Sequence, residues 1–326
     1  MTALSFNKNL VIVVTLGWAL LSAGAQAPPP PNARSSNPIK STLPVISTVS
    51  SAPKSNLPAE EQRPLPDISQ LMHEVEAHEK ASEAIQKDYL YHAADTVREL
   101  NSHGNVKKTE SREYDAFWIE GVPVERLTKK DGKALSAEEQ KKQGERIDKL
   151  VAKARERRAK ADAKGEETDP YGNEEVTVSR LLELGSFGNA RRVILNGRST
   201  IVVDYVGDPK ARTRNRMESV IRDMAGTIWV DEQDRAIVKI EGHFLNTFKI
   251  GAGLLVNIQK GTSFSMEQQK VNNEVWLPRQ LEGHGAARMF LLFKFNGDFS
   301  EVDSDYRKFK VTSTILPGIG LASPMK

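Results

Sequence analysis

The sequence predicts an α+β protein in which one large, curved antiparallel sheet packs on helices. Hairpin patterns follow one another through residues 190–311, each with two strand-like segments around a polar turn. Helical patterns are confined to residues 67–85 and to a block at 136–187, and this segregation of helices from strands is typical of α+β folds. Apolar residues on both strand faces of the segment 289–295 indicate that the sheet curves around a hydrophobic interior.

The first 25 residues have the pattern of a secretory signal peptide. Lys8 is their one charged residue, and an apolar segment follows at 10–25. Ala23-Gly24-Ala25 predicts cleavage after Ala25, because a cut after Ala27 would leave Pro28 directly behind it. The apolar segment is shorter than the ~20 residues that span a bilayer, which disfavours the alternative of an uncleaved membrane anchor. We therefore expect an exported protein that begins at Gln26 and is periplasmic, with an extracellular location as the alternative.

Residues 26–66 are predicted to form a disordered tether rich in proline and serine. The stretch 28–66 holds ten of the sixteen prolines, seven serines and no aromatic residue. Such a composition buries too little apolar surface to offset the entropy of ordering the chain. Because the chain has no cysteine, the folded part must be stabilised by its core, even in an oxidising compartment.

The folded part is expected to begin with a helix and a three-stranded meander. Pro66-Asp67-Ile68-Ser69 is typical of a helix start, and an apolar stripe follows as far as Ile85. The segments 87–100 and 106–121 flank a polar turn and predict a hairpin, which 122–129 continues.

A helical insertion at 136–187 interrupts the sheet. Ser136 and Glu139 form a capping-box pattern, and 176–187 predicts a second, more apolar helix. Residues 141–164 hold ten Lys/Arg and four Asp/Glu, a net charge of +6, so this segment is a candidate for contact with a polyanion or an envelope protein. Interleaved acids and missing aromatic residues argue against nucleic acid. The candidate contact residues are Lys149, Lys153, Arg157 and Arg158.

The C-terminal half predicts a run of hairpins. The segment 190–207 turns at Asn196-Gly197, a strong hairpin signal. The segment 225–244 turns at 231–234, 263–283 turns at Asn272-Asn273, and 287–311 closes the sheet.

The stretch HEVEAH at 73–78 resembles the HExxH signature of zinc proteases, but its spacing differs. His73 and His78 are five residues apart, whereas HExxH places its histidines four apart on one helix face. On a helix the two side chains would diverge by about 140°. We expect a polar helix face here and no metal.

The sequence contains no recognisable catalytic constellation. The other four histidines are scattered, and there is no G-x-S-x-G motif, phosphate-binding glycine loop or cysteine. Asp303 and Asp305 are expected at a hairpin tip, in preference to the alternative of a calcium site. We predict a protein that is not an enzyme and needs no cofactor or metal.

Large apolar side chains are the strongest candidates for a binding function. A curved sheet with a hydrophobic hollow would present some of them to a ligand; an ordinary two-layer core is the alternative. The candidate ligand-binding residues are Trp118, Trp229, Phe244, Phe248, Trp276, Met289, Leu291 and Phe293.

Several segments resemble a known family of exported proteins. The quoted stretches are "KDYLY" (87–91), "AGTIWVDEQDRAIVKIEG" (225–242), "EVWLPRQLEG" (274–283) and "YRKFKV" (306–311). Their order and spacing resemble the LolA/LolB-like periplasmic proteins that sort outer-membrane lipoproteins in Gram-negative bacteria. The resemblance covers about 67–312 and leaves 313–326 as a C-terminal tail. It implies a single domain with an unclosed antiparallel barrel around helices.

The resemblance implies a non-catalytic carrier of a lipid or acylated protein, in peripheral rather than integral contact with membranes. The chain departs from the family in its length, its tether and its basic insertion, and no family site residue can be matched to it. The second hypothesis is therefore a non-catalytic sensor or interaction module that uses the fold surface and the basic helix at 136–164.

Overall fold

The structure of the protein is a computed structural model that describes residues 63–166, 168–173, 175–250, 256–289 and 293–309, with the backbone alone at 289, 293 and 294. The predicted signal peptide, most of the tether and the tail at 313–326 lie outside these residues. The helices are α2 (Ile68–Gln86), α3 (Ala137–Asp162), α4 (Val178–Leu184) and α5 (Arg216–Arg222). None of these described helices combines the length and hydrophobicity needed to cross a membrane.

The strands form one antiparallel sheet that does not close. They are β1 (Tyr89–Leu100), β2 (Val106–Ile119), β3 (Val122–Lys130), β4 (Lys133–Ala134), β5 (Gly185–Leu195), β6 (Arg198–Gly207), β7 (Met224–Asp231), β8 (Ala236–Phe244), β9 (Phe248–Ile250), β10 (Val256–Ile258), β11 (Ser263–Val271), β12 (Val275–Met289) and β13 (Phe293–Lys308). Their order is β4-β3-β2-β1-β13-β12-β11-β8-β7-β6-β5, with β10 between β12 and β9. In this path β4 and β5 are the two ends, so the predicted α+β fold with an open, curved antiparallel sheet is confirmed.

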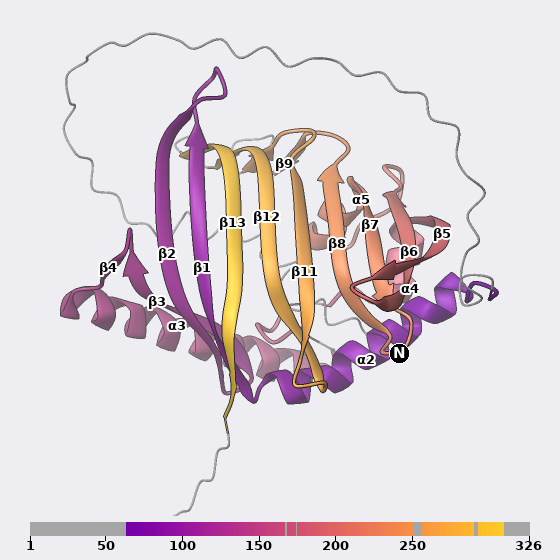
Figure 1. Cartoon of the computed structure of the whole chain (residues 1–326), viewed down its shortest axis with the longest axis horizontal. Coiled ribbons are helices and arrows are strands. Elements are labelled where there is room, and N and C mark those ends of the chain that lie inside the picture. The colour runs from indigo at the N-terminus through magenta and orange to yellow at the C-terminus, as the bar shows by residue number, and fades with distance from the viewer. Residues whose placement is uncertain (1–62, 167, 174, 251–255, 290–292, 310–326) are drawn as a thin grey trace, which may run out of the picture.

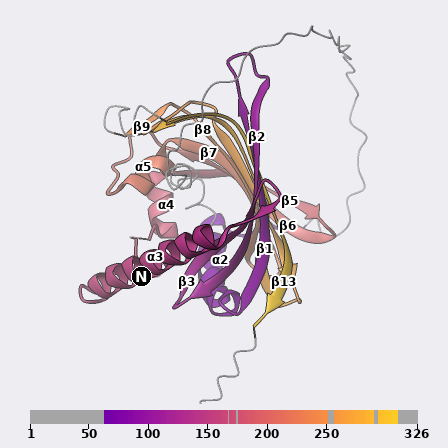
Figure 2. The same cartoon turned by 90° about the vertical axis from the view of Figure 1, so that its left-hand side faces the viewer.

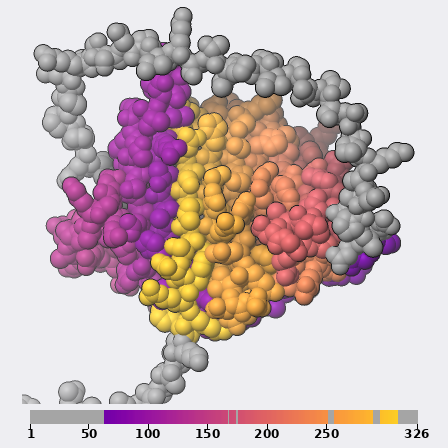
Figure 3. Space-filling view, viewed as in Figure 1, coloured from indigo at the N-terminus to yellow at the C-terminus, as the bar shows by residue number. Residues whose placement is uncertain are grey.

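Helices cover the hollow side of the sheet. Figure 1 shows the strands side by side with α2 running across their lower ends, and Figure 2 shows the curvature, with α2, α4 and α5 on the inner side. The opposite, outer face in Figure 3 is formed by the strands themselves. The main core lies between the two layers and joins Leu71, Met72 and Val75 of α2 to Leu181 and Leu184 of α4 and to the strands β6–β13.

Local turn chemistry explains why the hairpins form where the sequence predicts them. Asn196 and Gly197 have φ of 50° and 77°, and Asn272 and Asn273 have φ of 51° and 57°. Two successive residues with positive φ give the turn whose twist matches that of the flanking strands. The hairpins β5–β6 and β11–β12 follow directly.

The basic insertion is anchored to the sheet by a narrow apolar seam. The capping box at Ser136 and Glu139 is present at the start of α3. Ile147, Val151 and Ala154 of α3 pack against Val122 and Val124 of β3 in a small core of their own. The rest of the helix carries the exposed charges, as its sequence predicts.

Four parts of the chain differ from the sequence-based expectation. Asp303 and Asp305, expected at a hairpin tip, lie inside β13, where Asp303 is buried and pairs with Ala93. The helix expected at 176–187 is shorter, because β5 begins at Gly185, whose backbone is already extended. The helix α5 and the short strands β9 and β10 were not predicted at all, since seven- and three-residue elements carry too little periodicity.

Candidate functional site

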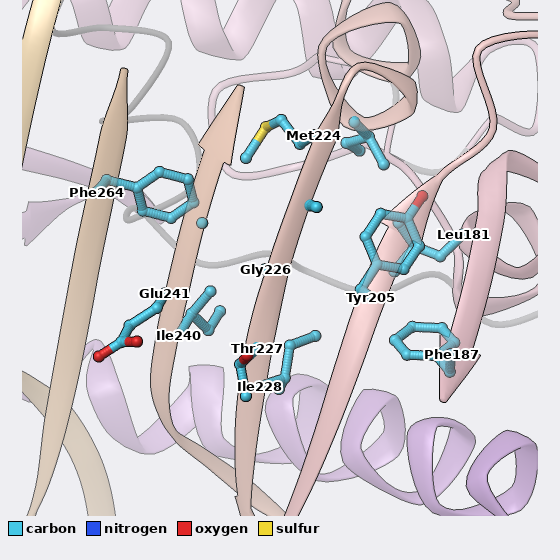
Figure 4. A pocket seen from close by; sticks show the side chains of 13 residues that line it. Leu181, Phe187, Tyr205, Met224, Gly226, Thr227, Ile228, Ile240, Glu241 and Phe264 are labelled. Atoms are coloured by element: carbon cyan, nitrogen blue, oxygen red, sulfur yellow. The ribbon is translucent and has the colours of Figure 1, made fainter. Parts of the chain in front are cut away.

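A small hydrophobic cavity lies on the inner face of the sheet, between β5–β8 and the helices α4 and α5 (Figure 4). Its volume is about 60 Å³, and its surface is entirely apolar. The residues around it are Leu181, Phe187, Tyr205, Ile221, Met224, Ala225, Gly226, Thr227, Ile228, Ile240, Glu241, Gly242 and Phe264.

Two facing glycines make the floor of the cavity. Gly226 on β7 is in register with Gly242 on β8, so two neighbouring strands present no side chain at the same level. On either side of this pair stand aromatic residues, Tyr205 on β6 and Phe264 on β11, both in register with the glycines. The result is a trough between two aromatic walls.

The same level of the sheet continues as an alternation of glycine and aromatic residues. From Phe264 the register runs through Gly283 on β12 to Phe299 on β13. A methyl group added at Gly242 would lie 2.5 Å from the Phe264 ring, so this ring extends over the glycine beside it. Glycines of this kind let a sheet bend sharply, and adjacent aromatic rings cover the exposed backbone.

The helices α4 and α5 form the cover of the cavity. Leu181 of α4 and Ile221 of α5 contribute its upper wall. Arg180 joins the helices, since its Nε donates to Glu218 Oε1 at 2.7 Å and its Nη2 donates to Oε2 at 3.0 Å. Burial opposes ionisation of Glu218, but hydrogen bonds from Arg180 and from the Arg214 backbone outweigh it and lower its pKa.

The next inward-facing row of residues, two positions along the strands from the glycine pair, changes from apolar to charged as it crosses the sheet. Val203, Ile228, Ile240, Met266 and Leu281 lie in register across β6, β7, β8, β11 and β12. The next three positions of the same row, on β13, β1 and β2, are Glu301, Asp95 and Arg112. The inner face therefore has an apolar half, which holds the cavity, and a polar half.

Asp95 is the central residue of the polar half. It is 6% exposed, and its Oδ2 accepts a hydrogen bond from the Tyr114 hydroxyl at 3.1 Å. Burial raises its pKa to about 6, although Arg112 and Tyr114 favour the ionised form. Asp303, also buried, shares its face one position further along β13.

The three tryptophans predicted to bind a ligand lie away from the cavity. Trp229 follows the inward-facing Ile228 on its strand and so points to the other face, where the Lys239 ammonium lies 5.2 Å from its ring centroid. Trp276 belongs to the same outer cluster, and its Nε1 donates to Asp234 at 3.0 Å. Trp118 lies beside Lys87 at the end of α2.

The predicted phenylalanines are closer to the cavity but do not line it. Phe244 and Phe248 pack against one another in the main core, with ring centroids 6.1 Å apart. Met289 and Phe293 pair at the end of the β12–β13 ladder, although their side chains are outside the described structure. Leu291 lies outside the described residues altogether. Ligand binding by these eight residues stays a prediction.

Of the four predicted contact residues on α3, two are occupied by bonds within the chain. Arg157 Nη1 donates to Asn173 at 3.0 Å, and Arg158 Nη2 donates to the carbonyl of Glu120 at 2.8 Å. Lys149 and Lys153 are exposed and remain available to a partner.

The histidines of HEVEAH lie on α2 and contact other side chains of that helix. His73 lies 3.3 Å from Glu76, and His78 lies 3.0 Å from Ser82. Within the described ranges no group of three His, Cys, Asp or Glu is arranged to hold a metal ion. The absence of a metal and of catalysis stay predictions.

The residues that line the cavity were not predicted from the sequence. The predicted ligand-binding residues are all large apolar side chains, whereas two of the lining residues are glycines. The available signal was a glycine inside each of the strand-like stretches "AGTIW" and "KIEG", on either side of the turn at 231–234. A glycine inside a strand often marks a place where a ligand or another backbone approaches closely.

Comparison with known proteins shows only loose likeness. No family model matches the sequence, and no curated protein matches it. Among solved structures, one neighbour is a domain from Vibrio parahaemolyticus assigned to the outer membrane lipoprotein-sorting proteins, with 11% identity, a TM-score of 0.35, and coverage of 74% of this chain and 93% of that one.

Two further solved structures show weaker likeness. A DUF1329 family protein from Desulfovibrio piger has 8% identity and a TM-score of 0.29 over 74% of this chain and 92% of its own. The MucA/MucB complex of Pseudomonas aeruginosa matches with 8% identity and a TM-score of 0.21, over 72% of this chain and 92% of that one. The predicted resemblance to lipoprotein-sorting proteins thus recurs among the neighbours, at low identity.

Proposed function

We propose that the protein is an exported, non-catalytic carrier that binds a lipid or an acylated protein through an acyl chain. The observation that carries this proposal is the apolar trough lined by Gly226 and Gly242. A surface without polar atoms offers an apolar ligand burial and offers a polar ligand nothing.

The size of the cavity limits what it holds in the described conformation. Sites for small molecules typically enclose about 300–1,000 Å³, whereas this cavity encloses about 60 Å³. It therefore accommodates the end of an acyl chain, and a longer part of the chain requires α4 and α5 to move away from the sheet. Each buried methylene contributes about 0.8 kcal/mol, against an association cost of at least ~4 kcal/mol. The resulting affinity is modest, which suits a carrier that must release its cargo.

Export to the periplasm supports the proposal from the sequence side. The signal-peptide pattern at 1–25 is typical of a protein that works outside the cytoplasm. The proline-rich tether at 26–66 is typical of a spacer that separates a folded domain from a partner or surface. Contact with membranes would then be peripheral.

The proposal is tested by filling the cavity. A dansyl-labelled undecanoic acid should bind the wild-type protein saturably, with unlabelled fatty acid displacing it. Leu181→Phe places a ring into the cavity from the cover and should weaken binding at least tenfold while the protein stays folded by circular dichroism. Ile194→Phe, at an exposed position on β5 away from the cavity, is the matched control and should bind normally. Saturable binding that persists in Leu181→Phe would place the ligand elsewhere.

The alternative function is a sensor or interaction module, and one observation favours it. The hollow of the sheet is largely filled by the protein's own helices, with Leu71, Met72 and Val75 of α2 buried against the strands. Lys149 and Lys153 on α3 would then contact an anionic partner. A wild-type protein that binds no acyl probe, and that carries no lipid when purified from its own envelope and weighed by native mass spectrometry, supports this alternative.

A further inference from the structure

One polar atom next to the cavity has no hydrogen-bond partner. The Tyr205 hydroxyl is fully buried, and no acceptor for it exists among the described residues. Tyr205 is 8% exposed, and its ring forms one wall of the cavity. Buried hydroxyls are nearly always bonded, because an unsatisfied one costs about 1–3 kcal/mol.

The surroundings of the hydroxyl explain why the protein does not satisfy it. A methyl group added at Gly185 would lie 2.6 Å from this oxygen, so the phenol lies directly over that glycine, where α4 passes into β5. The Phe187 ring stands beside it, with centroids 5.2 Å apart. Figure 4 shows the hydroxyl at the end of the cavity where Leu181 lies. The Phe187 ring and the backbone of Gly185 and Val206 thus lie around the hydroxyl, and none of the described residues forms a hydrogen bond with it.

Phenylalanine would fill the same volume at this position without leaving an unpaired donor. The cavity surface is entirely apolar and the Tyr205 hydroxyl is buried, so the hydroxyl lies behind the wall of a cavity that Leu181 also lines. A ligand that enters under α4 and displaces Leu181 would meet this oxygen at the end of the trough.

We propose that the ligand carries a carbonyl or hydroxyl oxygen on its apolar chain, and that the Tyr205 hydroxyl donates a hydrogen bond to that oxygen. This inference rests on the proposed function and specifies its substrate class: an oxygen-bearing chain, such as an acyl ester, is preferred to a plain hydrocarbon. The bond forms only when Leu181 moves, so binding and opening of the α4 cover occur together.

The experiment compares two competitors of similar length, methyl decanoate and dodecane, in displacing dansyl-labelled undecanoic acid. The wild-type protein should bind the ester more tightly, and Tyr205→Phe should lose about three- to tenfold affinity for the ester alone, the range expected for one hydrogen bond. Binding of dodecane should not change. Tyr205→Phe should also unfold at an equal or higher urea concentration, because it removes an unpaired donor.

Tyr114→Phe is the matched control, because the Tyr114 hydroxyl is already bonded to Asp95. It should lower stability and leave the preference for the ester intact. If Tyr205→Phe keeps the full preference for the ester, or if its stability falls as it would on losing a water-mediated bond, the inference is wrong and the carrier function stands. If the wild-type protein binds neither competitor nor the probe, the carrier function itself is wrong.

Discussion

Arg180 on α4 and Glu218 on α5 form a two-bond ion pair that fastens together the helices covering the cavity. The side chains are 12% and 2% exposed, so both charges are largely removed from water. Arg180 also donates to the carbonyl of Arg212, which ties the segment before α5 to the same point. The two short helices therefore behave as one cover, although neither has the length to be stable alone.

Breaking this pair should loosen the cover. Glu218→Gln removes the buried charged partner of Arg180 and leaves only the more exposed Glu183 paired with it. We expect a loss of about 2 kcal/mol of unfolding free energy, less than when a buried charge keeps no charged partner. Amide hydrogen exchange in residues 178–184 and 216–222 should become faster than in the strands. Urea denaturation and exchange mass spectrometry measure the two effects.

An exposed ion pair on α3 provides the control for this change. Glu138 pairs with Lys142 at 2.7 Å, with both side chains mostly in water. Glu138→Gln should leave the melting temperature unchanged, because surface pairs contribute little. Equal losses from the two substitutions would mean that the buried pair has no special role.

The glycine pair under the cavity gives a second prediction. A methyl group at Gly226 would lie 2.1 Å from the backbone oxygen of Glu241, whereas at Gly242 it meets the Phe264 ring, which can rotate away. Gly226→Ala should therefore destabilise the protein by more than about 2 kcal/mol, and Gly242→Ala by less, while the displaced Phe264 ring closes the trough. Gly188→Ala on β5, where the methyl group has no neighbour within 4 Å, should have little effect.

Stability should fall as the pH rises, because of a buried carboxyl group on α2. Burial raises the pKa of Glu79 to about 7 from its ordinary value of 4.5, although a backbone hydrogen bond from Ile237 partly opposes this. Below pH 4.5 the group is neutral in both states. Between pH 4.5 and about 7 the unfolded chain loses its proton more readily, so unfolding is increasingly favoured, by at most about 3.5 kcal/mol at ~1.4 kcal/mol per unit.

Substitution of this carboxyl group tests the assignment. The amide of the Glu79→Gln variant cannot ionise. The variant should therefore be as stable as the wild type at pH 4 and more stable at pH 8, and the two stability profiles should separate between these values. The pKa of Asp95 is also raised, so its ionisation lowers stability with rising pH in the same way. This second loss of stability should persist in Glu79→Gln and disappear in Asp95→Asn. Urea denaturation of the three proteins across this range measures both. A stability profile of Glu79→Gln parallel to that of the wild type would show that Glu79 does not titrate in this range.

The fold was predictable where local chemistry determines it. The turns at Asn196-Gly197 and Asn272-Asn273, the capping box at Ser136 and the segregation of helices from strands all depend on neighbours in sequence. The strand order does not: β1 pairs with β13 and β8 with β11, through contacts that no turn residue encodes. The family resemblance, not periodicity, supplied the open barrel.

The site was harder to predict, because it depends on which face each strand residue occupies. Trp229 is large and apolar, yet one position separates it from Ile228 and places it on the outer face. A register shift between Trp229 and Val230 further changes the alternation, and sequence alone gives no sign of it. The cavity is lined by Gly226 and Gly242, which become neighbours only when β7 and β8 pair.

The last prediction concerns the boundary between the tether and the folded domain. Sequence composition placed it at residue 66, but Arg192 on β5 donates to the backbone carbonyls of Arg63 at 2.6 Å and Pro64 at 3.1 Å. Arg192 is held in place by Glu232, and its hydrogen bonds lower the pKa of Glu232 to about 2. Residues 63 and 64 therefore contact β5, and we predict that this contact stabilises the domain.

Two deletions of different length should separate the tether from this anchor. Removing 28–62 from the exported protein keeps both carbonyl acceptors of Arg192, so the melting temperature should move by no more than about 2 °C. Removing 28–66 also deprives Arg192 of both carbonyl acceptors, and we expect a loss of about 1.5 kcal/mol, or about 3–6 °C. Arg63→Ala in the full chain keeps these carbonyls and removes only the exposed side chain that pairs with Glu232, so its effect should be small. Identical melting temperatures for the two deletions would return the boundary to residue 66, whereas a large loss from removing 28–62 would mean that the tether itself packs on the domain.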